Sequence, residues 1–300
     1  MEMRQISGFY FDTYNTITAP CEASLLESCM AACARYETVF SKTIPGSEVW
    51  QLNHAEGRSV TVGEDMQKVL SVSLELHAAS RGAFNIAVGA LMALWDFKRE
   101  TPALPETDIL RAALELSDAT RIELCENRVR MHAGMQIDLG GIAKGYIADR
   151  IAELLRKEGV PTALLNFGGN IVTLGPKPDG SAWRIGLQSP GGKWGEDYWA
   201  VTELTAGTVV TSGVYERGFE LGGKRYHHIL DPRTGYPAES GLLSVTIRGK
   251  DSMLADGLAT AALVMGASAG IALASEHGCQ AVVLTEDGHA LRSKDFPLIL

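Results

Sequence analysis

The sequence predicts an α+β fold with mixed, mostly antiparallel sheets and flanking helices. Helical apolar spacing dominates the first half of the chain, and short apolar segments of strand length dominate the second. Strands that cluster after helices, instead of alternating with them, favour antiparallel sheets over a parallel α/β sheet. The chain contains no sequence repeat, no low-complexity tract and no linker. We therefore expect one domain over residues 1–300, with two intertwined subdomains as the alternative.

The first half is predicted to begin with a strand and to continue with helices. Tyr, Thr and Ile alternate over residues 9–19, which is typical of a strand, and residues 21–40 have helical spacing. A loop over 41–53 leads into a short helix. Apolar spacing and bounding Gly or Pro residues then predict helices over 63–80, 84–97 and 105–116, a hairpin of 121–125 with 129–132, and a helix over 141–158 that Gly159 closes.

The second half is predicted to consist mainly of short strands. Two Gly-rich or Pro-rich segments, 176–181 and 189–195, predict surface loops and not hinges. Helical spacing returns only near the end of the chain, where Asp287-Gly288 predicts a tight turn. The predicted strands cover 162–167, 170–174, 183–188, 199–204, 209–212, 219–221, 225–229 and 242–248, followed by helices over 252–264 and 268–276 and a hairpin of 280–284 with 289–293.

Composition excludes several classes of protein. The formal net charge of −9 and the absence of Lys/Arg-rich runs argue against a nucleic-acid partner. No apolar stretch is long enough for a transmembrane segment, and the first residues lack the pattern of a secretory signal. We therefore expect a cytoplasmic protein, although a chain whose leader had been removed would look the same. The five cysteines lack the spacing of a zinc site and favour free buried thiols in a reducing compartment.

The segment 251–266 carries the strongest chemical signal. It is apolar on most faces of a helix, yet it contains Asp256 and Thr260, which are four residues apart and therefore share one face. A carboxylate and a hydroxyl in this arrangement are hard oxygen ligands of the kind that Mg²⁺ prefers. The alternative is that Asp256 caps a neighbouring loop and that Thr260 bonds to its own helix. Taken alone, the segment favours that alternative.

A second motif, Gln136-Ile-Asp-Leu-Gly-Gly-Ile-Ala-Lys144, places two glycines between a predicted strand and a predicted helix. Backbone N–H groups and the positive end of the helix dipole would then lie beside Asp138 and Lys144, where a phosphate could bind. The alternative is a capping role for Asp138 and a solvated Lys144. The spacing of a P-loop is absent.

Three further segments are weak signals when each is taken alone. Residues 165–171 hold a Gly-Gly pair between apolar strands, and residues 210–219 place hydroxyls, a Tyr and an Arg at a strand end. His227 and His228 are adjacent on a predicted strand, so their side chains should point to opposite faces. Either histidine could be structural, and either could be a general base near neutral pH.

Together these segments make the chain resemble the ApbE-type flavin transferases, also called FAD:protein FMN transferases. The resemblance extends over nearly the whole chain, and its blocks occur in the order and spacing of that family. They are Phe40-Ser41, Pro45, Ser47-Glu48 and Leu52-Asn53, Gly82-Ala-Phe-Asn-Ile86, Asp138-Leu-Gly-Gly-Ile-Ala-Lys-Gly145, Asn166-Phe-Gly-Gly-Asn170, Thr211-Ser-Gly213 with Tyr215 and Arg217, His228-Ile-Leu-Asp-Pro-Arg-Thr-Gly-Tyr-Pro237, and Ala255-Asp-Gly-Leu-Ala-Thr-Ala261.

The resemblance implies a T-fold-like architecture, binding of FAD with Mg²⁺, and transfer of the FMN half of FAD to a Ser or Thr hydroxyl of an acceptor flavoprotein, with release of AMP. It implies that Asp256, Thr260 and the backbone carbonyl of Gly141 hold the metal, and that His228 is the general base. The positions that it implies for FAD binding are Thr43, Ala83, Phe84, Asn85, Asp138, Lys144 and Ile229.

The chain departs from the family pattern mainly on the FAD side. Asn85 stands where Asp is frequent, Thr43 where some members have Tyr, and Phe11-Asp12-Thr13 where Met-Gly-Thr is usual. Two other functions use the same residues: a Mg²⁺-dependent FAD pyrophosphatase that yields FMN and AMP, and a non-catalytic FAD-binding protein. The sequence leaves open the acceptor, the oligomeric state and the choice between Mg²⁺ and Mn²⁺.

Overall fold

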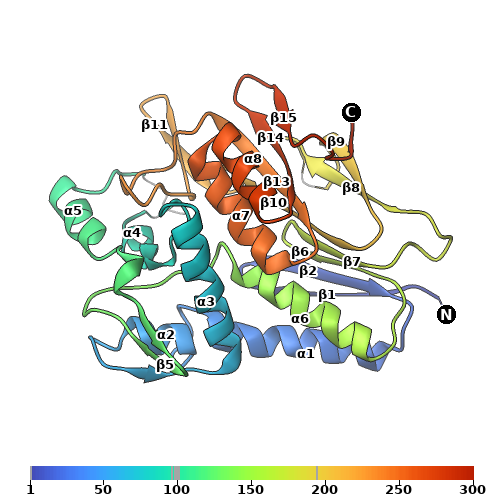
Figure 1. The fold of residues 1–300 in the computed structure, drawn as a ribbon, viewed down its shortest axis with the longest axis horizontal. Helices are drawn as coiled ribbons and strands as arrows, with labels where there is room; N and C mark the ends of the chain where they lie inside the picture. Colours follow the sequence, from blue (N-terminus) through green and yellow to red (C-terminus); the bar gives the residue numbers. More distant parts are fainter. Residues whose placement is uncertain (1, 96, 98–101, 194) are drawn as a thin grey trace.

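The computed structural model describes residues 2–95, 97, 102–193 and 195–300 (Figure 1). Its centre is an eight-stranded sheet with the strand order β1-β2-β6-β7-β10-β13-β14-β15. Every recorded strand pair of the described residues is antiparallel. The strands of the central sheet are β1 (Arg4–Tyr10), β2 (Thr13–Ala19), β6 (Ala163–Phe167), β7 (Asn170–Leu174), β10 (Gly207–Gly213), β13 (Leu242–Gly249), β14 (Gln280–Thr285) and β15 (Ala290–Arg292).

Helices cover one face of this sheet, and a small sheet lies on the other. Helix α1 (Ala23–Phe40) packs on β1, α6 (Ala143–Lys157) on β6 and β7, α7 (Ser252–Met265) on β10 and β13, and α8 (Ala267–Glu276) on β14 (Figure 1). The small sheet has the order β16-β9-β8, with β8 (Trp183–Gln188), β9 (Tyr198–Leu204) and β16 (Leu298–Ile299). Alternating residues of the central strands therefore supply two separate apolar clusters, one on each face.

The remaining elements surround one end of the central sheet. Helix α3 (Glu64–Ala79) packs against α7, and a third apolar cluster has Trp95 at its centre. The Trp95 ring contacts the rings of Phe97, Phe219, Tyr226 and Tyr236. The other elements are α2 (Glu48–Asn53), β3 (Val60–Thr61), η1 (Ile86–Val88), α4 (Gly89–Leu94), α5 (Thr107–Glu115), η2 (Ala119–Arg121), β4 (Glu123–Cys125), β5 (Arg128–Arg130), β11 (Gly218–Leu221) and β12 (Lys224–His227).

The predicted fold class is confirmed, and most predicted elements are present with shifted ends. The single strand over 9–19 is wrong, because Phe11 and Asp12 form a turn between β1 and β2 with φ of 57° and 60°. Positive φ is unfavourable for such side chains, but the Phe11 N–H donates to Glu37 and the Asp12 carboxylate pairs with Arg217. These contacts come from distant parts of the chain and hold the turn.

Several helix and strand predictions need further correction. The helix over 84–97 is wrong in part, because Phe84 and Asn85 precede η1 and α4 ends at Leu94. Residue 96 of that prediction lies outside the described residues. Helix α6 begins at Ala143 and not at residue 141, β12 ends at His227, and the short strands β3 and β16 were not predicted.

The cysteine and membrane predictions can also be compared with the structure. All five cysteines are free, and four are buried, whereas Cys125 is exposed, so the prediction of buried thiols is wrong at that position. Among the described residues, no helix is both long and apolar enough to cross a bilayer. The organisation as one domain stays a prediction.

Candidate active site

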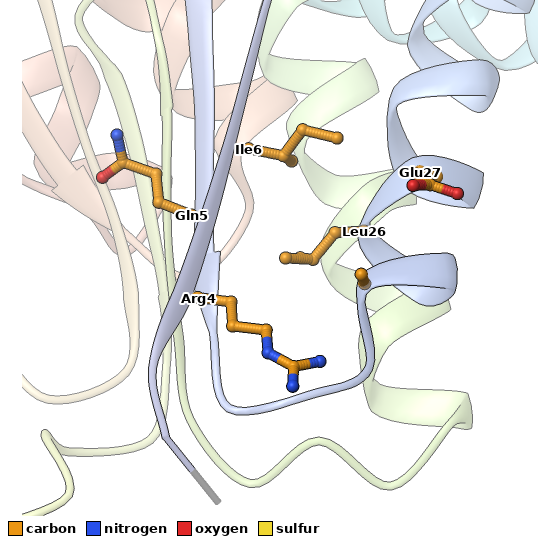
Figure 2. A pocket seen from close by; sticks show the side chains of 6 residues that line it. Arg4, Gln5, Ile6, Leu26 and Glu27 are labelled. Carbon is orange, nitrogen blue, oxygen red and sulfur yellow. The ribbon is translucent and has the colours of Figure 1, made fainter.

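All the site residues predicted from the sequence line one cavity of about 810 Å³, a volume within the usual range for ligand clefts. The cavity lies where the β1–β2 turn, the loop after α1, the start of α6, the middle of α7 and the loops around β11 and β12 converge. A smaller pocket of about 310 Å³ lies between β1 and α1, where Ile6 and Leu26 point toward each other (Figure 2). None of the predicted site residues lines that pocket.

The middle of α7 contributes Asp256 and Thr260 to the lining of the cavity. Asp256 is only 3% exposed, and its Oδ2 atom accepts hydrogen bonds from the Gly145 N–H (3.0 Å) and from Asn170 Nδ2 (2.9 Å). Gly145 lies in the first turn of α6, so Asp256 bonds to a neighbouring helix and not to a loop, as the alternative had it. Oδ1 of Asp256 accepts none of the hydrogen bonds recorded among the described residues.

Thr260 and Gly141 line the same cavity as Asp256. A Cβ atom on Gly141 would lie 3.0 Å from Thr260 Oγ1, so the absence of a side chain at Gly141 leaves room beside the hydroxyl. A carboxylate, a hydroxyl and a backbone turn without a side chain together suit a Mg²⁺ ion that also keeps water or phosphate ligands. The described residues contain no group of three or more His, Cys, Asp or Glu side chains arranged to hold a metal ion, so such a site would depend on Asp256 and on neutral oxygens.

The turn before α6 forms a charged wall of the cavity. Lys42 Nζ lies 2.6 Å from Asp138 Oδ2, and the Gly140 N–H donates to Asp138 Oδ1 (2.8 Å). Burial opposes ionisation of Asp138, but Lys42 and this N–H hold the pKa of its carboxyl below the usual range. Lys144 Nζ donates to the Gly140 carbonyl (2.9 Å) and lies 3.8 Å from Asp256 Oδ2. Its side chain is 25% exposed, so it is not a solvated surface lysine.

His228 follows β12 and faces the same cavity. Its Nδ1 lies 3.3 Å from the Arg217 carbonyl oxygen, which can only accept a hydrogen bond, so Nδ1 carries the proton and Nε2 keeps a free lone pair. Burial, together with the neighbouring charge of Arg217, lowers the pKa of His228 to about 4, although the bond to the Arg217 carbonyl opposes this shift. The imidazole is therefore neutral at pH 7 and can accept a proton.

His227, the last residue of β12, has a different environment. Its Nε2 donates to the Ala238 carbonyl (3.0 Å), and its Nδ1 accepts from the Ile229 N–H (3.3 Å). Both ring nitrogens are thus used inside the protein, and the side chain is only 7% exposed. His227 is structural, and His228 is the histidine of the cavity.

The positions expected to bind the flavin also line the cavity, but their side chains differ in availability. Ala83, Phe84 and Ile229 are buried and supply apolar wall. The Asn85 side chain is already engaged, since Oδ1 accepts from the Ala87 N–H (2.8 Å) and Nδ2 donates to the Ser117 carbonyl (2.7 Å). Thr43 is exposed, and its hydroxyl lies 3.1 Å from Ser41 Oγ.

Comparison with known proteins gives a family for this fold and site. The model of the ApbE family matches residues 11–283. The chain belongs to the ApbE family. A protein of Klebsiella pneumoniae named FAD:protein FMN transferase is 39% identical over 263 residues, which are 86% of this chain and 78% of that relative. A protein of Treponema pallidum with the same name is 37% identical, over 84% of this chain and 74% of that relative.

Solved structures of the ApbE family have the same fold. The crystal structure of the ApbE protein of Thermotoga maritima superposes with a TM-score of 0.90 at 32% identity, over 98% of this chain and 97% of that chain. The flavinyl transferase ApbE of Pseudomonas stutzeri gives a TM-score of 0.85 at 28% identity, over 97% and 94% of the two chains. The predictions of an ApbE-type architecture and of an enzyme of this family are thereby confirmed.

Sequence reasoning missed several residues of this ApbE-type cavity. Lys42 and Asn170 reach Asp138 and Asp256 across 96 and 86 positions of sequence, which no local pattern can reveal. Glu216 also lines the cavity, and burial raises the pKa of its carboxyl, as does the Asp256 charge, while Lys144 and Arg217 oppose the shift. Only the block containing residues 211–217 signalled this loop, and it gave no role to Glu216.

Proposed function

We propose that this protein transfers the FMN moiety of FAD to a Ser or Thr hydroxyl of an acceptor flavoprotein, with Mg²⁺ bound, and releases AMP. The names of its relatives support transfer of a flavin. The observation that carries the proposal is that a neutral histidine with a free Nε2 lines the same cavity as the oxygen-rich wall of Gly141, Asp256 and Thr260. One wall can hold a divalent cation on a diphosphate, and the other can accept the proton of an incoming hydroxyl.

The proposed reaction uses these side chains as follows. The acceptor hydroxyl oxygen forms a bond to the FMN phosphorus as the bond from that phosphorus to the bridging oxygen breaks, and AMP takes that oxygen. The hydroxyl proton passes to His228 Nε2. A Mg²⁺ ion held by Asp256, Thr260 and the Gly141 carbonyl would neutralise charge on the phosphoryl oxygens. Lys144, 3.8 Å from Asp256, adds a positive charge at the same end.

Most of the rate enhancement in such a displacement comes from positioning and electrostatics. The main-chain carbonyl of Arg217 orients the His228 ring, and two donors on Oδ2 orient the Asp256 carboxylate. Both groups are therefore set before substrate enters. Loss of the general base should lower the rate by about 10²–10⁴.

The test is an incubation of the purified protein with FAD, Mg²⁺ and a candidate acceptor flavoprotein, followed by the intact mass of the acceptor. We expect a mass gain of FMN less water that EDTA abolishes and that His228→Ala lowers by the factor above. The matched control is His289→Ala, because His289 is exposed and lies outside the cavity. FMN and AMP without an acceptor adduct would instead favour a pyrophosphatase, and unchanged FAD would favour a binding protein.

A further inference from the structure

The turn between β6 and β7 places one amide beside the metal-binding carboxylate. Phe167 pairs with Asn170 across a two-residue turn of Gly168 and Gly169, both of which have positive φ, as the primed hairpin turns require. A Cβ on Gly168 would lie 2.5 Å from Thr13 Oγ1, so the turn also packs closely on β2. Asn170 is therefore held as the first residue of β7, at the cavity.

The Asn170 amide is buried and only half used. Asn170 is only 1% exposed. Its Nδ2 donates a hydrogen bond to Asp256 Oδ2 (2.9 Å), whereas its Oδ1 has no hydrogen-bond partner among the described residues. The reverse orientation would place Oδ1 against a carboxylate oxygen, so chemistry fixes Nδ2 as the atom that faces Asp256. A buried oxygen without a hydrogen-bond partner lowers the stability of the protein. An apolar side chain at position 170 would avoid that cost. The advantage of an amide at this position is therefore its hydrogen bond to Asp256.

We propose that Asn170 is a positioning residue that fixes the rotation of the Asp256 carboxylate and thereby sets the cation affinity of the site. Oδ2 receives two hydrogen bonds, from Asn170 and from the Gly145 N–H, so Oδ1 is the oxygen left for the ion. The Gly145 donor is main chain. Among the described residues, Asn170 is thus the uncharged side chain that donates to Asp256 and holds its carboxylate in this rotation.

This inference rests on the proposed function, because it concerns the cation that the function requires. Partners that orient a metal ligand through a hydrogen bond typically change metal affinity by about 10–100-fold when they are removed. We expect a loss of that size, and we expect saturating cation to restore most of the turnover. A merely structural role would instead lower stability and leave the affinity of the folded protein unchanged.

The test uses Asn170→Leu, which keeps the approximate side-chain volume, removes the donor and removes the unpartnered oxygen. Binding of Mn²⁺ is followed by the electron paramagnetic resonance signal of the free ion, with FAD present and in a His228→Ala background that limits turnover. The apparent KM for Mg²⁺ and the kcat at saturating Mg²⁺ are measured separately with intact His228. The matched control is Thr173→Val, since Thr173 lies on the opposite face of β7 with a buried, unpartnered hydroxyl.

The inference is supported if the Mn²⁺ dissociation constant rises about 10–100-fold in Asn170→Leu and stays unchanged in Thr173→Val. It is overturned if folded Asn170→Leu binds Mn²⁺ within twofold of the parent. Should the leucine variant fail to fold, Asn170→Ala is subject to the same comparison. Failure of the parent itself to bind Mn²⁺ would remove the proposed cation and this inference with it, whereas an effect of the variant alone leaves the transferase proposal intact.

Discussion

The close approach of α6 to α7 leads to a strong prediction for Gly145→Ala. A Cβ atom on Gly145 would lie 2.2 Å from the Ser252 carbonyl oxygen and 2.8 Å from Met253 Cα. Both atoms belong to the backbone, so no rotamer change can relieve the overlap. The helices would have to separate by roughly 1 Å to reach ordinary contact, and the 3.0 Å bond from the Gly145 N–H to Asp256 would then be broken.

The expected cost can be built from these two losses. Overpacking costs about 1–3 kcal/mol, and a hydrogen bond to a charged acceptor contributes about 1.5–3 kcal/mol. Replacing Gly by Ala inside a helix returns up to about 1 kcal/mol. We therefore expect the free energy of unfolding to fall by about 1.5–6 kcal/mol, together with weaker binding of the proposed cation, because Asp256 loses one of its two donors.

Urea unfolding and Mn²⁺ binding measure the two effects. Gly159→Ala is the matched control at the other end of α6: it strains a residue with φ of 73° but meets no atom within 4 Å. That variant should lose some stability and keep its affinity for Mn²⁺. If the free energy of unfolding of Gly145→Ala lies within about 0.5 kcal/mol of the parent's, and if the variant binds Mn²⁺ as tightly as the parent, the reasoning from close approach is refuted.

Three more predictions concern titration and packing. With the pKa of His228 lowered to about 4, kcat should stay level through pH 6.5 and fall only as the pH drops toward 4, which a pH profile of kcat would show. Burial, with the Asp251 charge, raises the pKa of Asp149 to about 7. The folded state therefore favours protonated Asp149. Between pH 4 and 7, the free energy of unfolding of the parent should fall by up to about 4 kcal/mol relative to that of Asp149→Asn, as measured by urea unfolding. An equal pH dependence of the two proteins would contradict this. Trp95→Ala should cost about 3–5 kcal/mol in the same assay, because it removes a buried ring together with its hydrogen bond to the Gly235 carbonyl (2.8 Å). Trp95→Phe should cost clearly less, because it loses that bond but keeps an aromatic ring in the cluster.

Local patterns were sufficient for the parts of the fold that local forces decide. Apolar spacing predicts helix α7 and places Asp256 and Thr260 on one face of it. The Asp-Gly pair at 287–288 predicts the turn between β14 and β15. The turn at Phe11 and Asp12 could not be predicted in this way, because contacts with Glu37 and Arg217 stabilise a conformation that the two residues do not favour by themselves.

The site shows the same division between local and distant causes. Family motifs identified residues that the fold does bring to one cavity, although their individual roles stay predictions. What the motifs could not show is which oxygen of Asp256 is occupied, which tautomer His228 adopts, and that the Asn85 side chain is already engaged. Each of these depends on a partner that only the three-dimensional path of the chain brings near.

The carbonyl that orients His228 belongs to the main chain, and this has a consequence for redesign. No substitution at position 217 deletes that oxygen, so the histidine tautomer is inherited from the path of the loop and not from its side chains. The tautomer is thereby independent of the side chains of the β10–β11 loop, whereas the pKa of His228 is not, because the Arg217 charge helps to lower it. An engineer could therefore change the uncharged side chains of that loop without altering which nitrogen of His228 carries the proton, provided that the backbone keeps its course.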